Sequence, residues 1–121
     1  MGAKVLIVED EPHIVESLSF LLSREGFSIA SCGDGAAAME RMLADPPDVL
    51  VLDAMLPGLS GFEILRRLRA DPKLADLAVL MLTAKGQKRD RKVAEESGAN
   101  LFMTKPFSNS EVVDAVKRLA K

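Results

Sequence analysis

Five polar residues lie at or just after the ends of short apolar runs: Glu9, Asp10, Asp53, Thr83 and Lys105. Asp53 directly ends four apolar residues, where a carboxylate should be partly enclosed, and enclosing a charge without a purpose is unfavourable. An aspartate can attack a phosphoryl group and hold it as an acyl phosphate. Lys105 and Thr83 supply a cation and a hydroxyl that could neutralise the phosphoryl oxygens. These residue types indicate phosphoryl transfer to Asp53.

The acidic members of this set also indicate a metal site. Glu9, Asp10 and Asp53 would repel one another at one sheet edge unless a cation joined them. Carboxylate oxygens suit Mg²⁺, which keeps several waters and takes only one or two carboxylates directly. Each acid taken alone is better explained as a solvated side chain at a strand end. The prediction of a Mg²⁺ site therefore depends on the three acids meeting.

Five short apolar runs could form the strands that bring these residues together. They cover residues 5–8, 27–32, 49–52, 79–82 and 101–103. Four of them lack an alternation of apolar and polar residues, as expected for strands covered on both faces of a parallel sheet. The run at 27–32 does alternate, which is typical of an edge strand. The carboxyl ends of parallel strands meet at one edge, where α/β proteins bind their ligands.

A segment with helical periodicity follows each of the five runs. Helix signals include Pro12 in a first turn, Asp34 as a cap, and a capping box that begins at Ser108. A helix over residues 89–97 should end at Gly98, where helices often use a left-handed residue. This alternation predicts an α/β fold, a doubly wound parallel sheet with helices on both faces.

Composition narrows the class of protein. A chain of 121 residues can bury the core of one ordinary globular domain without disulfides. Its formal net charge of −2 argues against general binding to nucleic acid or to an anionic membrane. A single cysteine, Cys32, excludes an internal disulfide or a thiolate metal cluster and fits a reducing compartment. No apolar run is as long as a signal peptide or a membrane span, so we expect a cytoplasmic domain.

The ordered motifs at these strand ends resemble one family. They are Val-Glu-Asp-Glu at residues 8–11, Leu-Asp-Ala-Met-Leu-Pro-Gly at 52–58, Leu-Thr-Ala at 82–84 and Thr-Lys-Pro-Phe at 104–107. From residue 5 to about residue 119, the chain resembles the receiver domain of two-component response regulators. The resemblance implies a flavodoxin-like fold, with five strands in the order 2-1-3-4-5 and five flanking helices. It also implies one receiver domain over residues 1–121, with any effector outside the chain.

The same resemblance implies roles in a phosphorelay. Asp53 would accept a phosphoryl group from a phosphohistidine, and Lys105 would pair with the phosphoryl oxygens. Thr83 would contact the group through its hydroxyl, and Ala84 through its backbone. The chain would catalyse only its own phosphorylation and slow dephosphorylation, so it would not be an enzyme in the ordinary sense.

The resemblance also implies a set of Mg²⁺ ligands. Asp10 and Asp53 would bind the ion directly, and Glu9 would act mainly through a bound water. Met55 would contribute its backbone carbonyl rather than its sulfur. These four residues extend the acidic cluster that the residue types alone predict.

A conformational switch is implied as well. Thr83 would close onto the phosphoryl group after transfer, which would let Phe102 turn inward. The altered surface would lie on the fourth helix, the fifth strand and the last helix. The bond between Lys105 and Pro106 would be cis, an isomer that proline tolerates at modest cost.

The implied partners are proteins. A sensor histidine kinase or a histidine phosphotransfer protein would dock near His13, Ile14 and Ser17, with Phe107 close by. A downstream protein effector, or an effector domain absent from this chain, would respond to the switch. Many relatives dimerise through acids that follow a Gly-Ala pair, where this chain has Asn100. We therefore expect a monomer or a weak dimer, without direct nucleic-acid binding.

Met55 and Lys85 occupy two positions that influence hydrolysis of the phosphoryl group in this family. Neither side chain is an acid or an amide that would readily position a water. The resemblance thus predicts a long-lived phosphorylated state.

Three alternatives differ in the chemistry they require. A haloacid-dehalogenase-like phosphatase needs a second aspartate two residues after the nucleophile, where this chain has Met55. A flavodoxin-like electron carrier needs a phosphate cradle after the first strand, where Glu9, Asp10 and Glu11 would repel phosphate. A degenerate receiver that only binds proteins is disfavoured by the complete set of acids, threonine and lysine.

Overall fold

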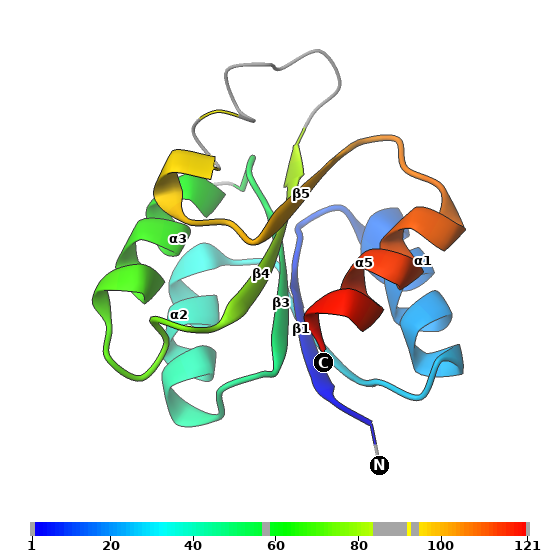
Figure 1. The fold of residues 1–121 in the computed structure, drawn as a ribbon, viewed down its shortest axis with the longest axis horizontal. Coiled ribbons are helices and arrows are strands. Elements are labelled where there is room, and N and C mark those ends of the chain that lie inside the picture. The colour runs from blue at the N-terminus through cyan, green and yellow to red at the C-terminus, as the bar shows by residue number, and fades with distance from the viewer. Residues whose placement is uncertain (1, 57–58, 84–91, 93–94, 121) are drawn as a thin grey trace.

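The computed structural model describes residues 2–56, 59–83, 92 and 95–120, and its fold is a parallel sheet between two layers of helices (Figure 1). The strands run in the order β2-β1-β3-β4-β5 and all four pairings are parallel. Their bounds are β1 Lys4–Val8, β2 Ser28–Cys32, β3 Val49–Asp53, β4 Ala78–Thr83 and β5 Leu101–Thr104. The predicted strands, their order and the position of 27–32 at a sheet edge are confirmed.

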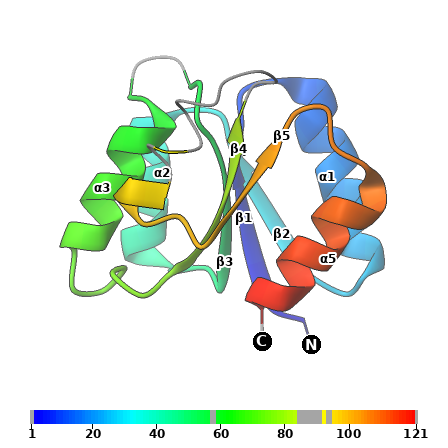
Figure 2. The same ribbon diagram turned by 45° about the horizontal axis from the view of Figure 1, so that its top comes forward.

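Helices cover both faces of the sheet, as Figure 2 shows. Their bounds are α1 Pro12–Arg24, α2 Gly35–Ala44, α3 Gly61–Ala70 and α5 Asn109–Leu119. α1 and α5 lie on one face, and α2 and α3 on the other. Most of the helix predicted over residues 89–97 lies outside the described residues. Residue 92 and residues 95–97 are helical, and Gly98 follows with a φ of 98°.

Local sequence signals explain where the described helices begin. Pro12 opens α1, and the Asp34 side chain accepts a hydrogen bond from the N–H of Ala36 at the start of α2. Ser108 and Glu111 form the expected capping box of α5. Each such cap satisfies backbone N–H groups that have no partner within the helix, typically contributing about 1 kcal/mol.

The core has one cluster on each side of the sheet, and β3 serves both. Leu50 and Leu52 pack with the cluster under α2 and α3. Val49 and Val51 pack with the cluster under α1 and α5. Successive strand residues point to opposite faces, so both faces of this central strand require apolar side chains. That is why its sequence shows no alternation, and why the strand can hold Asp53 at a fixed place.

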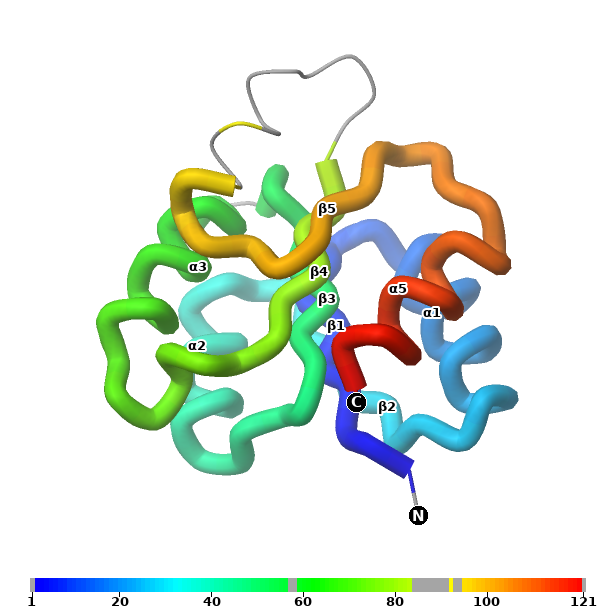
Figure 3. The backbone as a smooth tube through the Cα atoms, in the orientation of Figure 1, coloured from blue at the N-terminus to red at the C-terminus, as the bar shows by residue number. Residues whose placement is uncertain are grey.

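Both ends of the described chain lie at the amino-terminal end of the sheet, away from the acidic loops (Figure 3). No helix among the described residues is long and apolar enough to cross a membrane.

Candidate functional site

The three predicted acids meet at the carboxyl edge of the sheet. Asp53 ends β3, and Glu9 and Asp10 follow β1, the neighbouring strand. One carboxylate oxygen of each of these three residues lies within 4.8 Å of the others. The parallel pairing of β1 with β3 produces this meeting, because it places both carboxyl ends at one edge.

The members of this acidic cluster differ in their exposure to solvent. Glu9 and Asp53 are each only 2% exposed, whereas Asp10 is exposed. Glu9, Asp53 and Thr83 are the buried polar or charged residues of the described chain. All three therefore belong to the site predicted from the sequence. Burial of this kind is unfavourable for a charged group unless another group compensates it.

Lys105 supplies part of that compensation. Its Nζ lies 2.8 Å from Glu9 Oε1 and 3.3 Å from Asp53 Oδ1. Burial opposes the charged form of this lysine, but the two carboxylates outweigh that effect and raise the pKa of Lys105 above its ordinary value. One lysine faces three acids, so the cluster keeps an excess of negative charge.

Glu9 is the least satisfied member. Burial raises the pKa of Glu9, while Lys105 and the N–H of Glu11 oppose that rise. Glu9 Oε2 accepts a hydrogen bond of 3.1 Å from Glu11. Glu9 Oε1 is the buried side-chain oxygen of the described residues that has no hydrogen bond, since its contact with Lys105 is an ion pair without hydrogen-bond geometry.

The loop after β3 fixes the Asp53 side chain. The N–H of Met55 donates to Asp53 Oδ1 over 3.2 Å. The Met55 side chain is 64% exposed, so no part of the core holds it. The backbone N–H of Met55 thus orients the acid, while its carbonyl as a Mg²⁺ ligand stays a prediction.

Thr83 is the last residue of β4 and is hydrogen-bonded to the end of β5, beside the acids. It pairs with Thr104 in the sheet, and its carbonyl accepts a hydrogen bond of 2.8 Å from the N–H of Lys105. Its hydroxyl lies 3.5 Å from the carbonyl of Met103. Thr83 and Lys105 are thereby held at neighbouring strand ends, and the Lys105–Pro106 peptide bond is cis.

Other residues named from the sequence lie around this centre. Phe102 is partly buried and packs against the cluster under α2 and α3. Ile14 and Phe107 pack against the opposite cluster, while His13 and Ser17 are exposed on α1. Ala84 and Lys85 lie outside the described residues.

The donor atoms of the acidic cluster fit Mg²⁺. They are carboxylate oxygens, the ligand type that this hard cation prefers. A cation would add to the compensation that Lys105 already gives the buried Glu9 Oε1. Glu9, Asp10 and Asp53 are therefore the residues that could hold the ion.

The family model described as the response regulator receiver domain matches residues 5–117. The chain belongs to this family. Receiver domains of two-component response regulators are phosphoacceptor signalling switches rather than classical enzymes, and they bind Mg²⁺ at an acidic pocket. The resemblance inferred from the motifs is confirmed.

Relatives of this receiver domain differ in length and context. The alkaline phosphatase synthesis transcriptional regulatory protein PhoP of Bacillus subtilis is 40% identical over all 121 residues. The match covers 50% of PhoP, and the chain spans about half the length of the curated relatives it matches.

Solved receiver domains share the fold. A Chloroflexus aurantiacus protein assigned as a response regulator is 32% identical with a TM-score of 0.96, and the match covers 99% of this chain and 98% of that one. The receiver domain of a sensor histidine kinase from Pseudomonas aeruginosa is 27% identical with a TM-score of 0.91. That match covers 99% of this chain and 98% of the other, whose structure has a magnesium ion coordinated in the active site cleft.

Proposed function

We propose that Asp53 accepts a phosphoryl group from a phosphohistidine in a Mg²⁺-dependent reaction, and that the product switches the surface offered to a partner. The observation that carries this proposal is the buried Asp53 carboxylate, which contacts Lys105 and lies within 4.8 Å of Glu9 and Asp10 oxygens. The magnesium ion in the Pseudomonas aeruginosa receiver domain supports the same chemistry here.

In the proposed transfer, a carboxylate oxygen of Asp53 attacks phosphorus while the bond from phosphorus to the donor imidazole nitrogen breaks. The products are an aspartyl phosphate and a neutral imidazole, because the donor ring leaves with the proton that its other nitrogen carries in the protonated phosphohistidine. Lys105 pairs with the phosphoryl oxygens and remains protonated, since its pKa is raised. The Met55 N–H keeps the acid oriented.

Glu9, Asp10 and Asp53 would hold Mg²⁺ together with the backbone carbonyl of Met55. The ion would screen the carboxylates from the incoming phosphoryl group and stabilise charge on its oxygens. Without such a cation, two negative partners would approach each other at a site that already carries excess negative charge.

The switch would pass through Thr83. Its hydroxyl would turn toward the phosphoryl group, with the backbone of Ala84 as a second contact, and Phe102 would turn further inward. Phosphorylation would then change the face made by the fourth helix, β5 and α5. A downstream protein, or an effector domain outside residues 1–121, would bind that face.

The phosphoryl donor would be a sensor histidine kinase or a histidine phosphotransfer protein of the cytoplasm. The proposed docking surface comprises His13, Ile14 and Ser17 of α1 with Phe107 nearby. This surface adjoins the site, because α1 begins two residues after Asp10.

Intact mass spectrometry after incubation with phosphoramidate and Mg²⁺ tests the proposal. Phosphoramidate is a small donor whose bond from phosphorus to nitrogen resembles that of phosphohistidine. We expect a gain of one phosphoryl group that is lost with a chelator and in Asp53→Ala. Asp114→Asn, which changes an exposed acid on α5, serves as the control and should gain the group like the wild type.

No mass gain under any of these conditions would favour a degenerate receiver that only binds proteins. A haloacid-dehalogenase-like phosphatase would instead release inorganic phosphate continuously from a phosphomonoester. The exposed, apolar Met55 is poorly suited to the acid role that such an enzyme places two residues after its nucleophile.

A further inference from the structure

Gly61, the first residue of α3, packs its Cα against the backbone of the candidate acceptor, where no side chain would fit. It is buried, and a Cβ atom built at this position would lie 2.1 Å from the carbonyl oxygen of Asp53. The same Cβ would lie 2.9 Å from Cα of Ala54. The crowding atoms belong to the backbone, so no flexible side chain could move aside to relieve it.

Gly61 also forms a hydrogen bond with the segment that a side chain at this position would crowd. Its N–H donates to the carbonyl of Ala54 over 3.1 Å. One residue earlier, the Ser60 hydroxyl accepts a hydrogen bond from the N–H of Glu63 and caps the helix. The first turn of α3 therefore rests directly on the backbone that carries the Asp53 side chain.

Small shifts of that backbone matter because the acid has narrow geometric demands. Asp53 Oδ1 contacts both the Met55 N–H and Lys105 Nζ, at 3.2 and 3.3 Å. A reacting group displaced by about 1 Å can lose on the order of a hundredfold in rate. A side chain at position 61 would push the carbonyl of Asp53 away from α3 and change both contacts.

We propose that Gly61 is a positioning residue for phosphoryl transfer: its lack of a side chain lets α3 seat against the Asp53 backbone and set the acceptor's place relative to Lys105. This inference rests on the proposed role of Asp53. It assigns to Gly61 a task beyond ordinary packing, because the atom in closest contact belongs to the acceptor residue itself.

Gly35 provides a matched control for Gly61. It is likewise the buried first residue of a helix, α2, and a Cβ there would lie 2.8 Å from the carbonyl oxygen of Leu59 and 2.9 Å from Ile64 Cδ1. Gly35→Ala should therefore strain the packing, but its closest contacts do not include Asp53 or Ala54. Comparing the two alanine variants separates a general loss of packing from displacement of the acceptor.

The experiment measures the initial rate of phosphorylation by phosphoramidate at saturating Mg²⁺, per folded molecule, with urea unfolding of the same samples. For Gly61→Ala we expect a rate about tenfold or more below that of the wild type, as for other misplaced reacting groups. Gly35→Ala should also lose stability, by less because its Cβ meets its neighbours at 2.8 and 2.9 Å, and should keep a rate per folded molecule close to the wild type. Equal rates in the two variants would overturn the proposal.

A second pair of variants covers the case in which Gly61→Ala does not fold. Ser60→Ala and Ser108→Ala each remove a capping hydroxyl, from α3 and α5 respectively, without adding an atom. We expect Ser60→Ala alone to lower the rate, because only α3 begins on the acceptor backbone. Identical rates would contradict the proposal, and a wild type that gains no mass would instead refute the role of Asp53.

Discussion

Two clusters of charged and polar groups lie at opposite ends of the sheet and differ in how their charges are compensated. At the carboxyl edge, three acids lie together, and one lysine pairs with two of them, Glu9 and Asp53. At the other end, the Arg69 guanidinium donates its hydrogen bonds to neutral acceptors, with Asp76 as a nearby opposite charge. We call the second cluster the Arg69 node, and it consists of Arg69, Ala75, Leu77, Gly98 and Asn100.

Within the Arg69 node, the guanidinium donates hydrogen bonds to neutral acceptors on two other segments. Nη1 donates to the carbonyls of Ala75 and Leu77 at 2.9 and 2.7 Å. Nε and Nη2 donate to the carbonyl of Gly98, and Nη2 also reaches Asn100 Oδ1 at 2.9 Å. Asn100 Oδ1 accepts from the N–H of Val79 as well. This node therefore joins the end of α3 to the segments before β4 and β5.

The contrast separates a stabilising cluster from a reactive one. Polar groups that only support a fold are normally paired, because an unpaired buried group is unfavourable. The acidic cluster instead gathers three carboxylates, two of them paired with the same Lys105, at the place where a cation and a phosphoryl group are proposed to bind. Its excess negative charge is what those ligands would compensate.

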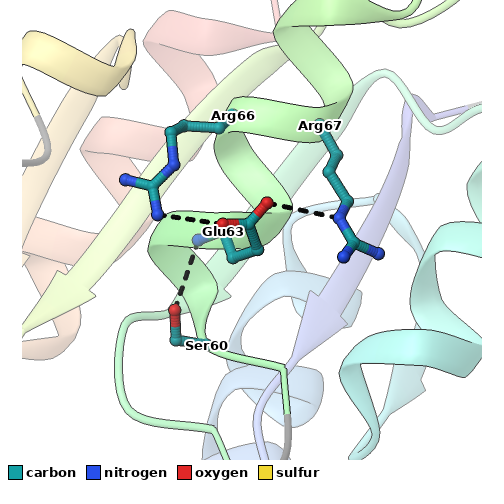
Figure 4. A network of polar contacts seen from close by, with 4 residues as sticks. All are labelled: Ser60, Glu63, Arg66 and Arg67. Carbon is teal, nitrogen blue, oxygen red and sulfur yellow. Dashed lines mark hydrogen bonds and ion pairs between the residues drawn. The ribbon is translucent and has the colours of Figure 1, made fainter.

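The largest effect should come from breaking the Arg69 node. Arg69→Met removes the guanidinium donor from three carbonyls and from Asn100 Oδ1, which keeps only the N–H of Val79, so we expect a loss of about 2 kcal/mol in the free energy of unfolding. Urea unfolding followed by far-UV circular dichroism would measure it. Arg66→Met is the matched control, since Arg66 lies exposed on the same helix and contacts only Glu63 in the network of Figure 4. Equal losses of unfolding free energy in Arg69→Met and Arg66→Met would contradict the stabilising role of the Arg69 node.

An intermediate effect should come from Met55, beside the reactive cluster. Its exposed thioether cannot position a water for attack on the phosphoryl group. Met55→Asn adds an amide that can, so dephosphorylation should become several times faster, while unfolding stability should barely change. Loss of phosphoryl mass with time measures the rate. A wild-type half-life of seconds, or an unchanged rate in the variant, would contradict this interpretation.

The smallest effect should come from the exposed Glu63 network of Figure 4. Hydrogen bonds from Arg66 and Arg67 hold the pKa of Glu63 below its ordinary value of 4.5. Its folded-state pKa is depressed, so its contribution to stability is present above the unfolded pKa and disappears as pH falls through the folded one. Glu63→Gln should change thermal stability slightly near neutral pH and not at all in strong acid. Since exposed ion pairs contribute little, a large change would be unexpected.

The sequence was sufficient to predict where the acids lie. Asp53 ends an apolar run that had to be a buried central strand, and Glu9 and Asp10 end its neighbour. Parallel strands bring such ends to one edge, so the meeting of the acids follows from chain order. The caps at Asp34 and Ser108 were predictable because they depend on contacts within a few residues.

The contacts formed across the fold were not predictable in the same way. Nothing local to Arg69 shows that its side chain reaches Gly98 and Asn100, because that contact depends on how α3 packs beside the segment before β5. The sequence alone also provided no reason to connect Gly61 with Asp53. A glycine at the first position of a helix is unremarkable until the structure shows the Asp53 carbonyl against it.

The acidic cluster is expected to be held in an unfavourable state that a cation relieves. Urea unfolding of wild type and Asp53→Asn, with and without Mg²⁺, tests it most directly. The chain has no Trp or Tyr, so circular dichroism is the suitable probe. Without Mg²⁺, we expect Asp53→Asn to be more stable than the wild type by about 1 kcal/mol, because it removes like-charge repulsion.

Adding Mg²⁺ should reverse or narrow that difference. At about ten times its dissociation constant, the ion should stabilise the wild type by about 1.4 kcal/mol and the variant by less. An Asp53→Asn variant that is less stable than the wild type in the presence of a chelator, with no response of either protein to Mg²⁺, would contradict the account.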